Sequence, residues 1–478
     1  MTGIDESRAL APRRALAVSA GKATRWLSRQ MGKGGGTTLP GLVAERLDPR
    51  VLRDLAASVP RGCVFVSGTN GKTTSTRILV DALQRAGMEP LTNREGSNLL
   101  HGLGTTLLVH AGPLGSLRVG DGAMGVFEVD EGHLLPAIEA VQPRLVVITN
   151  LLRDQLDRYF EIDWVAQLWR QALAKLPPSS TVVLNADDPQ VAHLGEGLPN
   201  PVIYYGVEDD GVGQTVLEHT SDSRRCLRCG VDLDYDRVYY AHLGHYRCPG
   251  CGWGRPTPAV AARAIALRGM DGSALRVSGP SGDVELELPL GGLHNAYNAL
   301  VAVAAATALD VDAGPVRDAV AAARSPFGRL ERFSLDGHDV VLALVKNPSG
   351  YNETLRLVTS DERPKGLMLA INDQIQDGRD VSWIWDVDFE RCRDGVEFVV
   401  CAGRRAHDMS VRLKYAGLFE RPGGPELIIE QDVLRAFDRA LARAPDGGPL
   451  FVLPTYTAMW TLRETLARAG HLEPFWRS

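Results

Sequence analysis

Short apolar runs alternate with longer amphipathic segments along most of the chain from residue 51 onward. Residues 63–66 form a compact apolar run typical of a buried strand, and residues 73–86 have the spacing of an amphipathic helix. Three more strand-like runs follow at residues 124–129, 145–149 and 181–184. Strands that alternate with helices in this way predict a mostly parallel sheet covered by helices, which is an α/β fold.

A second alternating series predicts a separate α/β domain at the C-terminal end. Its strand-like runs are residues 340–345, 366–371, 396–401 and 450–453. Before it come an alanine-rich helix, expected at 298–306, and a turn-forming segment at 325–331 that is typical of a junction between domains. The predicted parts are an N-terminal segment with a glycine-rich loop at 32–41 (1–50), a central domain (51–325), an insertion within it (222–255) and a C-terminal domain (326–478).

The composition supports a multidomain globular protein and excludes several other classes. The 478 residues are too many for one ordinary domain, and 44% of them are hydrophobic, which excludes disorder as the dominant state. The formal charge of −6 gives no basic surplus, so we expect no nucleic-acid partner. No apolar run approaches the ~20 residues of a membrane-spanning helix, and residues 15–20 are too short for the core of a signal peptide. We therefore expect a cytoplasmic protein without a transmembrane segment.

The strongest motif lies between the first strand and the first helix of the central domain. Residues 66–74 are Val-Ser-Gly-Thr-Asn-Gly-Lys-Thr-Thr, and a glycine-rich turn at a helix N-terminus directs backbone N–H groups at phosphate oxygens. The lysine supplies a full charge to the β- and γ-phosphates of ATP, and the threonine hydroxyl after it suits Mg²⁺. Val66 stands where the usual motif has its first glycine, so this loop is a shortened form. The predicted phosphate-binding residues are Gly68, Thr69, Asn70, Gly71, Lys72, Thr73 and Thr74.

Four of the seven cysteines form two close pairs inside the insertion. Cys226 and Cys229, and then Cys248 and Cys251, have the C-x₂-C spacing of a zinc ribbon, with an intervening length in the expected range. Four thiolates leave no open coordination position, so the predicted Zn²⁺ is structural. A redox disulfide pair is the alternative for these cysteines. The other three cysteines are expected to be buried packing residues.

Further motifs follow the phosphate loop in the order found in the ATP-dependent Mur ligases and folylpolyglutamate synthases. They are Phe-Glu-Val-Asp-Glu at 127–131, Thr-Asn-Leu-Leu-Arg-Asp-Gln-Leu-Asp at 149–157, Leu-Asn-Ala-Asp-Asp at 184–188, Gly-Leu-His-Asn-Ala-Tyr-Asn-Ala at 292–299 and Gly-Arg-Leu-Glu at 328–331. Together with the shortened loop, these motifs make about residues 60–335 similar to the Mur ligase family. The resemblance implies a central ATPase domain that drives the formation of an amide bond.

Several residues of these motifs are candidates for contacts with Mg²⁺ or with the nucleotide. Glu128 ends a strand at the edge where ligands of open α/β sheets collect, so it can complete a Mg²⁺ site with Thr73; otherwise it is a surface acid. The amides of Asn295 and Asn298 suit an adenine edge, or else they cap the helix that follows. Arg329 is expected to bind ribose or phosphate, or to form an interdomain ion pair.

Two departures from the Mur ligase pattern narrow these expectations. Only about 60 residues precede the phosphate loop, too few for the domain that binds the uridine nucleotide in amino-acid-adding Mur ligases. Gln155 stands where those ligases usually have a metal-binding histidine, which leaves a second Mg²⁺ site open. The acceptor is therefore not expected to be held through a uridine nucleotide.

The C-terminal part resembles the MurT family, the Mur-ligase-like subunits of lipid II isoglutaminyl synthases. The matching segments are Leu-Val-Lys-Asn-Pro-Ser-Gly at 344–350, the acidic stretch at 371–386 and Leu-Pro-Thr-Tyr-Thr-Ala-Met at 453–459. The resemblance implies that ATP activates the α-carboxylate of D-glutamate in the stem peptide of lipid II, as an acyl phosphate. It also implies a heterodimer with a GatD-like glutaminase subunit, which supplies ammonia for amidation to D-isoglutamine at the inner face of the membrane.

The acidic stretch at 371–386 carries the candidate functional cluster of the C-terminal domain. In the family, an aspartate of this domain is thought to complete the partner's Cys-His pair. Asp386, Asp380 and Asp377 are the candidates here, and Lys72 is the catalytic candidate of the phosphate loop. The alternative is a solvated acidic loop, which would also include Asp373.

Two further pairs of residues in this domain are candidates for contacts with a ligand or a partner. Lys346 and Asn347 are expected to contact nucleotide or substrate from the inner edge of the domain. Trp383 and Trp385 either pack in the interior or face a partner.

Two other functions stay open at this point. The first is a stand-alone amide ligase of the Mur or folylpolyglutamate type, which would add an amino acid. The second is a non-catalytic, zinc-bearing scaffold that binds ATP. The chain has no glutaminase signature, which favours a subunit that receives its nitrogen from elsewhere.

Overall fold

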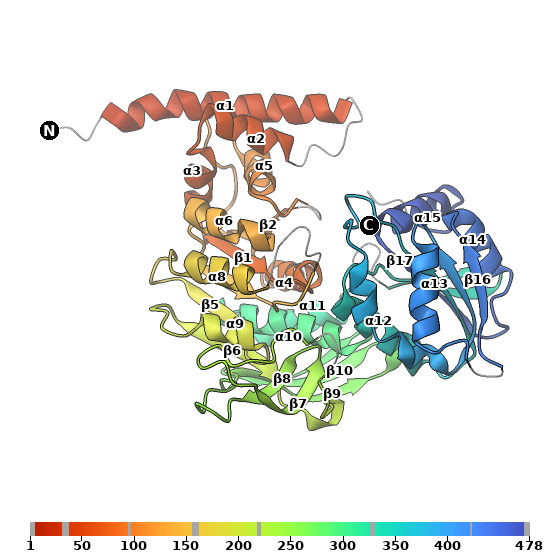
Figure 1. The fold of residues 1–478 in the computed structure, drawn as a ribbon. Coiled ribbons are helices and arrows are strands. Elements are labelled where there is room, and N and C mark those ends of the chain that lie inside the picture. The colour runs from red at the N-terminus through yellow and green to blue at the C-terminus, as the bar shows by residue number, and fades with distance from the viewer. Residues whose placement is uncertain are drawn as a thin grey trace.

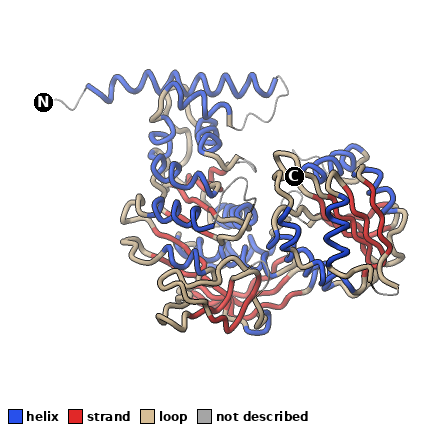
Figure 2. Tube along the Cα trace, in the orientation of Figure 1, coloured by secondary structure: helices blue, strands red, loops and turns tan. Residues whose placement is uncertain are grey.

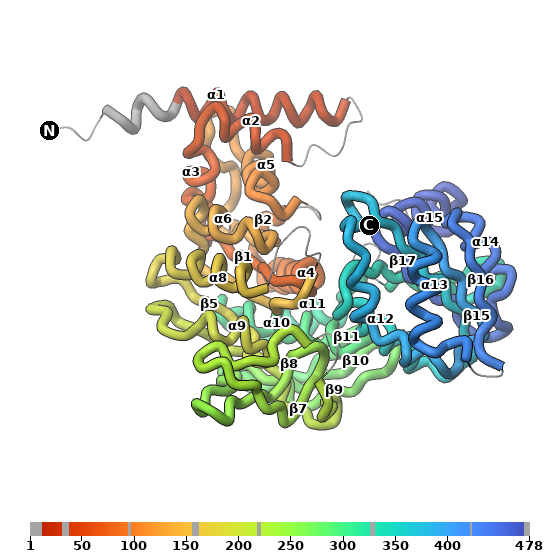
Figure 3. Tube along the Cα trace, in the orientation of Figure 1, coloured from red at the N-terminus to blue at the C-terminus, as the bar shows by residue number. Residues whose placement is uncertain are grey.

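The structure, a computed structural model, describes residues 5–30, 38–93, 97–154, 162–217, 221–325, 330–420 and 423–472. A large central α/β domain carries a layer of helices at its N-terminal end and lies beside a smaller C-terminal α/β domain (Figure 1). Helices cover the strands of both sheets (Figure 2), and the colours of Figure 3 show that each sheet comes from a separate part of the chain. The predicted α/β fold with two sheets is confirmed.

The central domain is built on a nine-stranded sheet in the order β11-β10-β9-β6-β5-β4-β1-β3-β2. All neighbours from β9 to β2 pair in parallel, whereas β10 and β11 extend one edge in antiparallel fashion. The carboxyl ends of the parallel strands therefore meet at one edge, where ligands of such sheets bind. The strands are β1 (Cys63–Ser67), β2 (Glu89–Thr92), β3 (Ala123–Glu128), β4 (Leu145–Ile148), β5 (Thr181–Asn185), β6 (Val202–Val207), β9 (Val260–Leu267), β10 (Ser273–Gly279) and β11 (Gly282–Leu288).

Side chains of this sheet alternate between two buried cores. Val64 and Val66 of β1 pack beneath α4, α10 and α11, whereas Cys63 and Phe65 pack on the opposite face beneath α3, α5, α6, α8 and α9. Because both faces are covered in the middle of the sheet, β1, β3, β4 and β5 are buried almost throughout, which explains the unbroken apolar runs in the sequence. The helices are α3 (Val51–Ala57), α4 (Lys72–Arg85), α5 (Leu100–His110), α6 (Leu134–Val141), α8 (Ile162–Leu173), α9 (Pro189–Leu194), α10 (Leu293–Ala308) and α11 (Ala313–Ala321), with short 3₁₀ turns at Glu131–His133, Asp210–Val212 and Gly269–Asp271.

Two further helices, α1 (Asp5–Gln30) and α2 (Leu39–Leu47), cover the end of the central domain. In Figure 1, α1 is the outermost element and lies across α2 and α5. Ala17 and Val18 of α1 are buried in the same core as Phe65. Among the described residues, no helix combines the length and the apolar character needed to cross a bilayer.

The glycine-rich loop predicted for residues 32–41 is wrong at its end, because α2 begins at Leu39. Pro40 suits the first turn of a helix, where its missing N–H has no partner to lose. Gly41 allows α2 to approach α5 closely, since a Cβ there would lie 2.1 Å from the carbonyl oxygen of His101. Residues 31–37 lie outside the described residues.

The insertion forms a small antiparallel hairpin of β7 (Asp234–Tyr240) and β8 (Leu243–Arg247), flanked by the two cysteine pairs. Tyr246 and Trp253 pack with Ala192 of α9 in a separate small core. Tyr239 and Tyr240 reach the main core of the central domain. The hairpin is therefore attached to the domain by its own side chains.

The C-terminal domain has a six-stranded sheet in the order β12-β13-β17-β14-β15-β16, parallel except for β12. One face packs under α12 and α13, and the other under α14 and α15. Four of its strands confirm the predicted runs with small shifts at their ends. The elements are β12 (Glu331–Leu335), β13 (His338–Leu342), α12 (Pro348–Ser360), β14 (Lys365–Ala370), the 3₁₀ turns Ser382–Asp386 and Phe389–Arg393, β15 (Val396–Ala402), α13 (Ala406–Tyr415), β16 (Glu426–Glu430), α14 (Val433–Leu441), β17 (Pro449–Pro454) and α15 (Tyr456–Arg468).

Candidate nucleotide site and cysteine cluster

The phosphate loop connects the carboxyl end of β1 to the first turn of α4. Gly71 immediately precedes the helix with a φ of 86°, a conformation that favours glycine. The Thr-Asn pair after β4 fixes the loop from the side. Asn150 Oδ1 accepts a hydrogen bond of 2.9 Å from the backbone N–H of Asn70, and Thr149 Oγ1 donates one of 2.7 Å to the carbonyl oxygen of Asn70. Two motifs far apart in the sequence thus form one structural unit.

The ammonium group of Lys72 is buried inside this loop. Its Nζ donates to the carbonyl oxygens of Gly68 and, at 3.2 Å, of Thr69, and it lies 3.1 Å from Glu131 Oε1. Burial lowers the pKa of Lys72, but the carboxylates of Glu131 and Glu128 outweigh this and raise the pKa above its ordinary value. The lysine therefore stays charged, as the binding of a phosphate requires.

Glu131 is a site residue that the sequence analysis missed. It is 6% exposed, and burial raises its pKa by more than the Lys72 ammonium lowers it. The motif at 127–131 contained this residue, but the pattern did not indicate that its side chain turns back toward the loop. The signal available was the pair of acids at residues 130 and 131, shortly after a strand that ends in Glu128.

The predicted Mg²⁺ ligands are brought together. Thr73 Oγ1 donates a hydrogen bond of 2.8 Å to Glu128 Oε2 at the carboxyl end of β3. Asn93 holds the backbone of Glu128 through two hydrogen bonds, because its Oδ1 accepts from the N–H at 3.0 Å and its Nδ2 donates to the carbonyl oxygen at 2.9 Å. A hydroxyl and a carboxylate are hard oxygen donors of the kind that Mg²⁺ prefers. The residues present fit such an ion.

A cavity that is partly open to solvent lies between the central and C-terminal domains beside the phosphate loop. Asn295 and Asn298 line it from α10, and Lys346 and Asn347 line it from the C-terminal domain. Its lining combines amide, charged and apolar side chains, which is typical of a small-molecule site. The other lining residues are Asn70, Gly71, Thr74, Asn150, Tyr240, His294, Ser325, Leu330, Ala343, Leu344, Ser349, Gly350, Glu353, Thr354 and Leu357.

The helix that carries the two asparagines begins earlier than predicted. It starts at Leu293 after Gly292, so Asn295 and Asn298 lie inside its first turns, and the alternative that they cap the helix is wrong. Asn295 Nδ2 donates to the carbonyl oxygen of Gly291 at 2.8 Å, and its Oδ1 accepts from Asn298 Nδ2 at 3.0 Å. This pair presents a fixed amide edge to the cavity.

Polar contacts connect the C-terminal domain to the phosphate loop. Lys346 Nζ lies 2.8 Å from Asp154 Oδ2, and Asn347 Nδ2 donates to Asn70 Oδ1 at 3.2 Å. Lys346 and Asn347 therefore lie where the sequence analysis expected them, at the inner edge of their domain.

The three candidate aspartates of the C-terminal domain have different surroundings. Asp386 Oδ2 accepts from Arg153 Nη1 of the central domain at 2.9 Å. Asp377 is 3% exposed and accepts from the backbone N–H and the hydroxyl of Thr457, at the start of α15, at 2.7 and 2.6 Å. Asp380 accepts from the N–H of Ser382 at 2.8 Å. Only Asp386 thus joins the two domains.

The other predicted residues of this region, one aspartate and two tryptophans, also differ in their surroundings. Asp373 forms ion pairs with Arg404 and Arg405 at 2.7 and 2.9 Å. Trp383 is buried against Tyr351, whereas Trp385 is 49% exposed beside Tyr415. Trp383 therefore packs in the interior, and Trp385 is free to face a partner. Gln155 and Arg329 lie outside the described residues.

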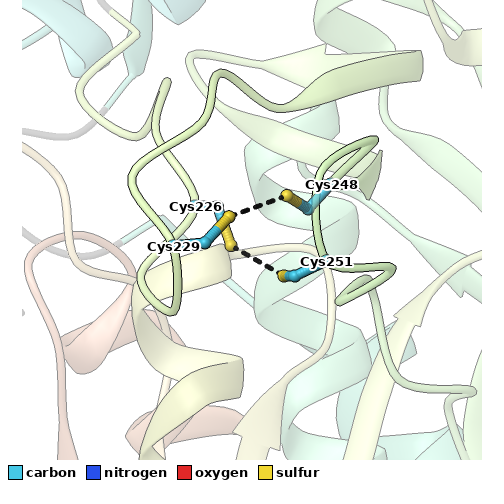
Figure 4. A group of neighbouring side chains, drawn as sticks. All are labelled: Cys226, Cys229, Cys248 and Cys251. Atoms are coloured by element: carbon cyan, nitrogen blue, oxygen red, sulfur yellow. Dashed lines mark hydrogen bonds between the residues drawn. The ribbon is translucent and has the colours of Figure 1, made fainter.

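The four cysteines of the insertion form one cluster (Figure 4). Cys226 Sγ lies 3.6 Å from Cys251 Sγ, Cys229 Sγ lies 3.4 Å from Cys248 Sγ, and all four sulfur atoms lie within 4.8 Å of one another. A tetrahedral Zn²⁺ with bonds of ~2.3 Å has sulfur–sulfur edges of about 3.8 Å. The donor type and the spacing both fit Zn²⁺.

The other cysteines are separate from this cluster. Cys63 is buried in the central domain, and Cys392 and Cys401 are buried in one core of the C-terminal domain. Burial raises the pKa of each thiol to about 12. A thiol that stays protonated is a poor nucleophile. These positions therefore behave as packing residues.

We expect Gly71→Ala to weaken ATP binding. A substitution at another glycine with a similar φ, away from the cavity, should not weaken it. The new Cβ would lie 2.1 Å from Asn298 Oδ1, in addition to the cost of about 1–2 kcal/mol for an L-residue in the left-handed region. Gly87→Ala is the matched control, because Gly87 has a φ of 79° with nothing within 4 Å of the added Cβ. ATP titration by calorimetry should show at least about a tenfold weaker Kd for Gly71→Ala only. Equal affinities of the two variants would contradict the placement of the nucleotide.

Comparison with known proteins agrees with this geometry. Residues 66–236 match the family model of the Mur ligase middle domain, and residues 344–459 match that of the MurT ligase C-terminal domain. Solved structures share the fold at low identity. A pseudomurein peptide ligase type C from Methanothermus fervidus has a TM-score of 0.66 at 22% identity, covering 85% of this chain and 78% of that one. MurF from Acinetobacter baumannii has a TM-score of 0.64 at 18% identity, covering 89% and 80%. The fold and the phosphate loop define a protein of the Mur ligase type.

Curated relatives narrow the class further. The MurT subunit of the lipid II isoglutaminyl synthase (glutamine-hydrolyzing) from Streptococcus pneumoniae is 33% identical over 95% of this chain and 96% of its own length. The corresponding subunit from Staphylococcus aureus strain N315 is 31% identical over 95% and 98%. The chain belongs to the MurT family.

Proposed function

We propose that this chain is the ATP-dependent synthase subunit of a lipid II isoglutaminyl synthase. In this reaction the α-carboxylate of D-glutamate in the lipid II stem peptide is phosphorylated by ATP, and ammonia displaces the phosphate to leave D-isoglutamine. The observation that carries the proposal is the full-length similarity to MurT subunits, combined with a phosphate loop that opens into the cavity between the domains. The reaction then takes place at the inner face of the membrane, where a lipid-linked precursor is available.

Phosphorylation solves a chemical problem of the acceptor. A carboxylate is a poor electrophile because its negative charge repels a nucleophile, and an acyl phosphate has lost that charge and gained a good leaving group. Lys72 and the N–H groups at the start of α4 are placed to stabilise charge on the phosphoryl group in transfer. Asn295 and Asn298 fit the adenine end of the same nucleotide, since they line the cavity beside the loop.

Thr73 and Glu128 are the residues that would hold Mg²⁺. A Mg²⁺ bound there would neutralise part of the phosphate charge. This chain positions the two oxygen donors: Asn93 fixes the backbone of Glu128, and Thr73 is held in the first turn of α4.

A separate glutaminase subunit of the GatD type is the proposed source of ammonia, in a heterodimer with this chain. The relatives are named as subunits of a glutamine-hydrolyzing enzyme. The three cysteines outside the cluster are buried, with raised pKa values, so none of them suits attack on glutamine. Trp385 and Asp386 are the proposed partner-facing residues of the C-terminal domain.

The test of the function is a reconstituted reaction with lipid II, ATP and Mg²⁺. Ammonium ions, or glutamine together with the glutaminase subunit, should each support ATP hydrolysis and convert the stem peptide to its amide, as detected by mass spectrometry. A stand-alone ligase of the Mur or folylpolyglutamate type would instead require an amino acid. ATP turnover that depends on an amino acid and not on ammonia would contradict the proposal.

The role of Asp386 can be separated from its ion pair by two substitutions. If Asp386 completes the partner's active site, Asp386→Asn should lower glutamine-dependent amidation by about a hundredfold, since an orienting aspartate contributes at least that much in related triads. Amidation driven by added ammonia should stay within about twofold, because the ATP site is untouched. The measurement is initial rate with each nitrogen source.

Arg153→Gln is the control, because it removes the same interdomain ion pair and keeps the Asp386 carboxylate; it also removes the ion pair of Arg153 with Asp222. We expect it to leave the glutamine-dependent rate within about threefold of the unmodified protein, as for a half-exposed pair. An equal loss of the glutamine-dependent rate in both variants would show that Asp386 acts through its ion pair with Arg153 and not in the active site of the partner.

A further inference from the structure

Helix α1 is the outermost element at the N-terminal end of the molecule (Figure 1), and it carries large exposed apolar side chains. Leu16, Trp26 and Leu27 are 61%, 62% and 50% exposed, and their spacing of ten and eleven residues places them on one face of a helix. On the opposite face, Ala17 and Val18 are fully buried against the central domain. The helix is thus held to the protein by one face and offers a second apolar face to its surroundings.

Exposed leucines also occur on the elements next to α1. Leu39 of α2 is 50% exposed, and Leu114, in the turn after α5, is 82% exposed. This turn reaches α1, because the position of a Cβ on Gly115 lies 2.8 Å from Arg14 Cγ. Isolated exposed leucines are common on proteins, but Leu16 and Leu27 share one face of α1 with an exposed tryptophan, and this combination marks an interaction surface.

The same end of the molecule has a local excess of positive charge. Residues 12–30 include five basic side chains and no acidic one, although the whole chain has a formal charge of −6. Burial and the neighbouring charges of Arg118 and Arg25 lower the pKa of Lys22. Burial, Arg25 and Lys22 likewise lower the pKa of His110. The basic side chains gathered at this end give it a positive potential that attracts anionic groups.

We propose that α1 lies flat on a membrane surface that contains anionic phospholipids, with Leu16, Trp26 and Leu27 in the boundary between headgroups and acyl chains. An apolar stripe with a tryptophan and flanking basic residues is the pattern of interfacial helices. Arg13 and Arg29 are exposed on either side of the stripe and would meet the lipid phosphates. Because α1 is the outermost element at this end of the molecule, the rest of the chain leaves its exposed face accessible to a flat surface (Figure 1). The inference goes beyond the proposed function, because membrane binding by α1 does not require the substrate to be present. Such binding would hold the ATP site near the membrane surface that carries a lipid-linked substrate.

Sedimentation of the full chain with lipid vesicles tests the proposal. Vesicles of equal parts phosphatidylglycerol and phosphatidylcholine should bind the chain at least about tenfold more tightly than vesicles of phosphatidylcholine alone, since each surface-proximal cation contributes to attraction by anionic lipid. Raising the salt concentration should weaken the binding, because the electrostatic part is screened.

Two double variants assign the binding to α1. Trp26→Ser/Leu27→Ser should weaken binding to the anionic vesicles by about tenfold or more, because two apolar anchors are removed. Arg29→Gln/Arg118→Gln should weaken it by a similar factor and reduce its dependence on salt. Val216→Ser/Leu267→Ser is the matched control, since these residues are 71% and 44% exposed in the central domain, and it should bind as the unmodified chain does. A thermal shift on ATP addition should be the same for all variants, which shows that each is folded.

Several results would overturn the proposal. They are a failure of the unmodified chain to sediment with anionic vesicles, equal binding to neutral vesicles, and unchanged binding of Trp26→Ser/Leu27→Ser. Gel filtration that shows a dimer dissociated by Trp26→Ser/Leu27→Ser, without vesicle binding, would assign the face to a second copy of the chain instead. None of these results touches the amidation proposal, because detergent-solubilised lipid II can be assayed without a membrane.

Discussion

Lys72→Ala is expected to lower ATP-dependent amidation by about a thousandfold or more. The ammonium group is the only full positive charge supplied by the phosphate loop itself, and removing one preorganised group that stabilises transferring charge typically costs a hundredfold to a thousandfold. Neither ammonia nor glutamine should restore the rate, since the loss precedes the nitrogen step. The measurement is the amidated fraction of lipid II over time with each nitrogen source.

The stability of this variant needs its own control, because Lys72 is paired with the buried Glu131. Removing one partner of a buried ion pair leaves an uncompensated carboxylate and destabilises the fold. Lys72→Ala/Glu131→Gln removes both charges, so its melting temperature should lie closer to that of the unmodified chain while its activity stays lost. A double variant that is both stable and active would rule out the catalytic role of Lys72. It would also favour a scaffold that binds ATP without using it.

Thr73 offers an independent check of the same site. Thr73→Ser keeps the hydroxyl that lies 2.8 Å from Glu128 and should retain most activity. Thr73→Ala removes that oxygen, so the Mg²⁺ concentration needed for half-maximal rate should rise by about tenfold or more. Titration of the rate with Mg²⁺ measures the difference. If the two variants behave alike, Thr73 is not a ligand.

Much of the fold could be predicted from the sequence because its strands are buried on both faces. Residues 63–66 are apolar without a break, and the structure divides them between two cores, with Val64 on one side and Phe65 on the other. Such a run needs no tertiary information to be recognised as a strand. The end of the glycine-rich loop was predicted wrongly for the opposite reason. Gly41 belongs to a helix because α2 must approach His101 closely, and that contact is invisible in the local sequence.

Part of the candidate site could likewise be predicted from local sequence patterns, and part of it could not. The phosphate loop and the pair of Thr73 and Glu128 could be predicted, because motif spacing and strand ends determine them. The contacts of Glu131 with Lys72, and of Asp386 with Arg153, could not be predicted from spacing. Each depends on how a turn or a whole domain is oriented, and long-range orientation leaves no periodic trace in the sequence.

Cys248→Ser is expected to abolish metal binding by the insertion and to destabilise the central domain. One lost thiolate breaks a closed four-sulfur site, and structural Zn²⁺ contributes folding free energy directly. We expect a loss of about 3 kcal/mol or more, which lowers the melting temperature by about 6 °C or more in a domain of this size. Elemental analysis should give one Zn²⁺ per unmodified chain and none in the variant. A chelator should reproduce the loss of stability in the unmodified chain.

Cys392→Ser separates the loss of a metal ligand from the general cost of changing a buried cysteine. Cys392 is fully buried in the core of the C-terminal domain, so its substitution should destabilise the protein modestly and leave the Zn²⁺ content unchanged. The effect of Cys248→Ser should also reach the nucleotide. The hairpin between the cysteine pairs carries Tyr240, which lines the cavity beside Asn150, so a loosened insertion should weaken ATP binding. A Cys248→Ser variant that kept its Zn²⁺, or lost it without any change in melting temperature or ATP affinity, would show that the cluster does not support the site.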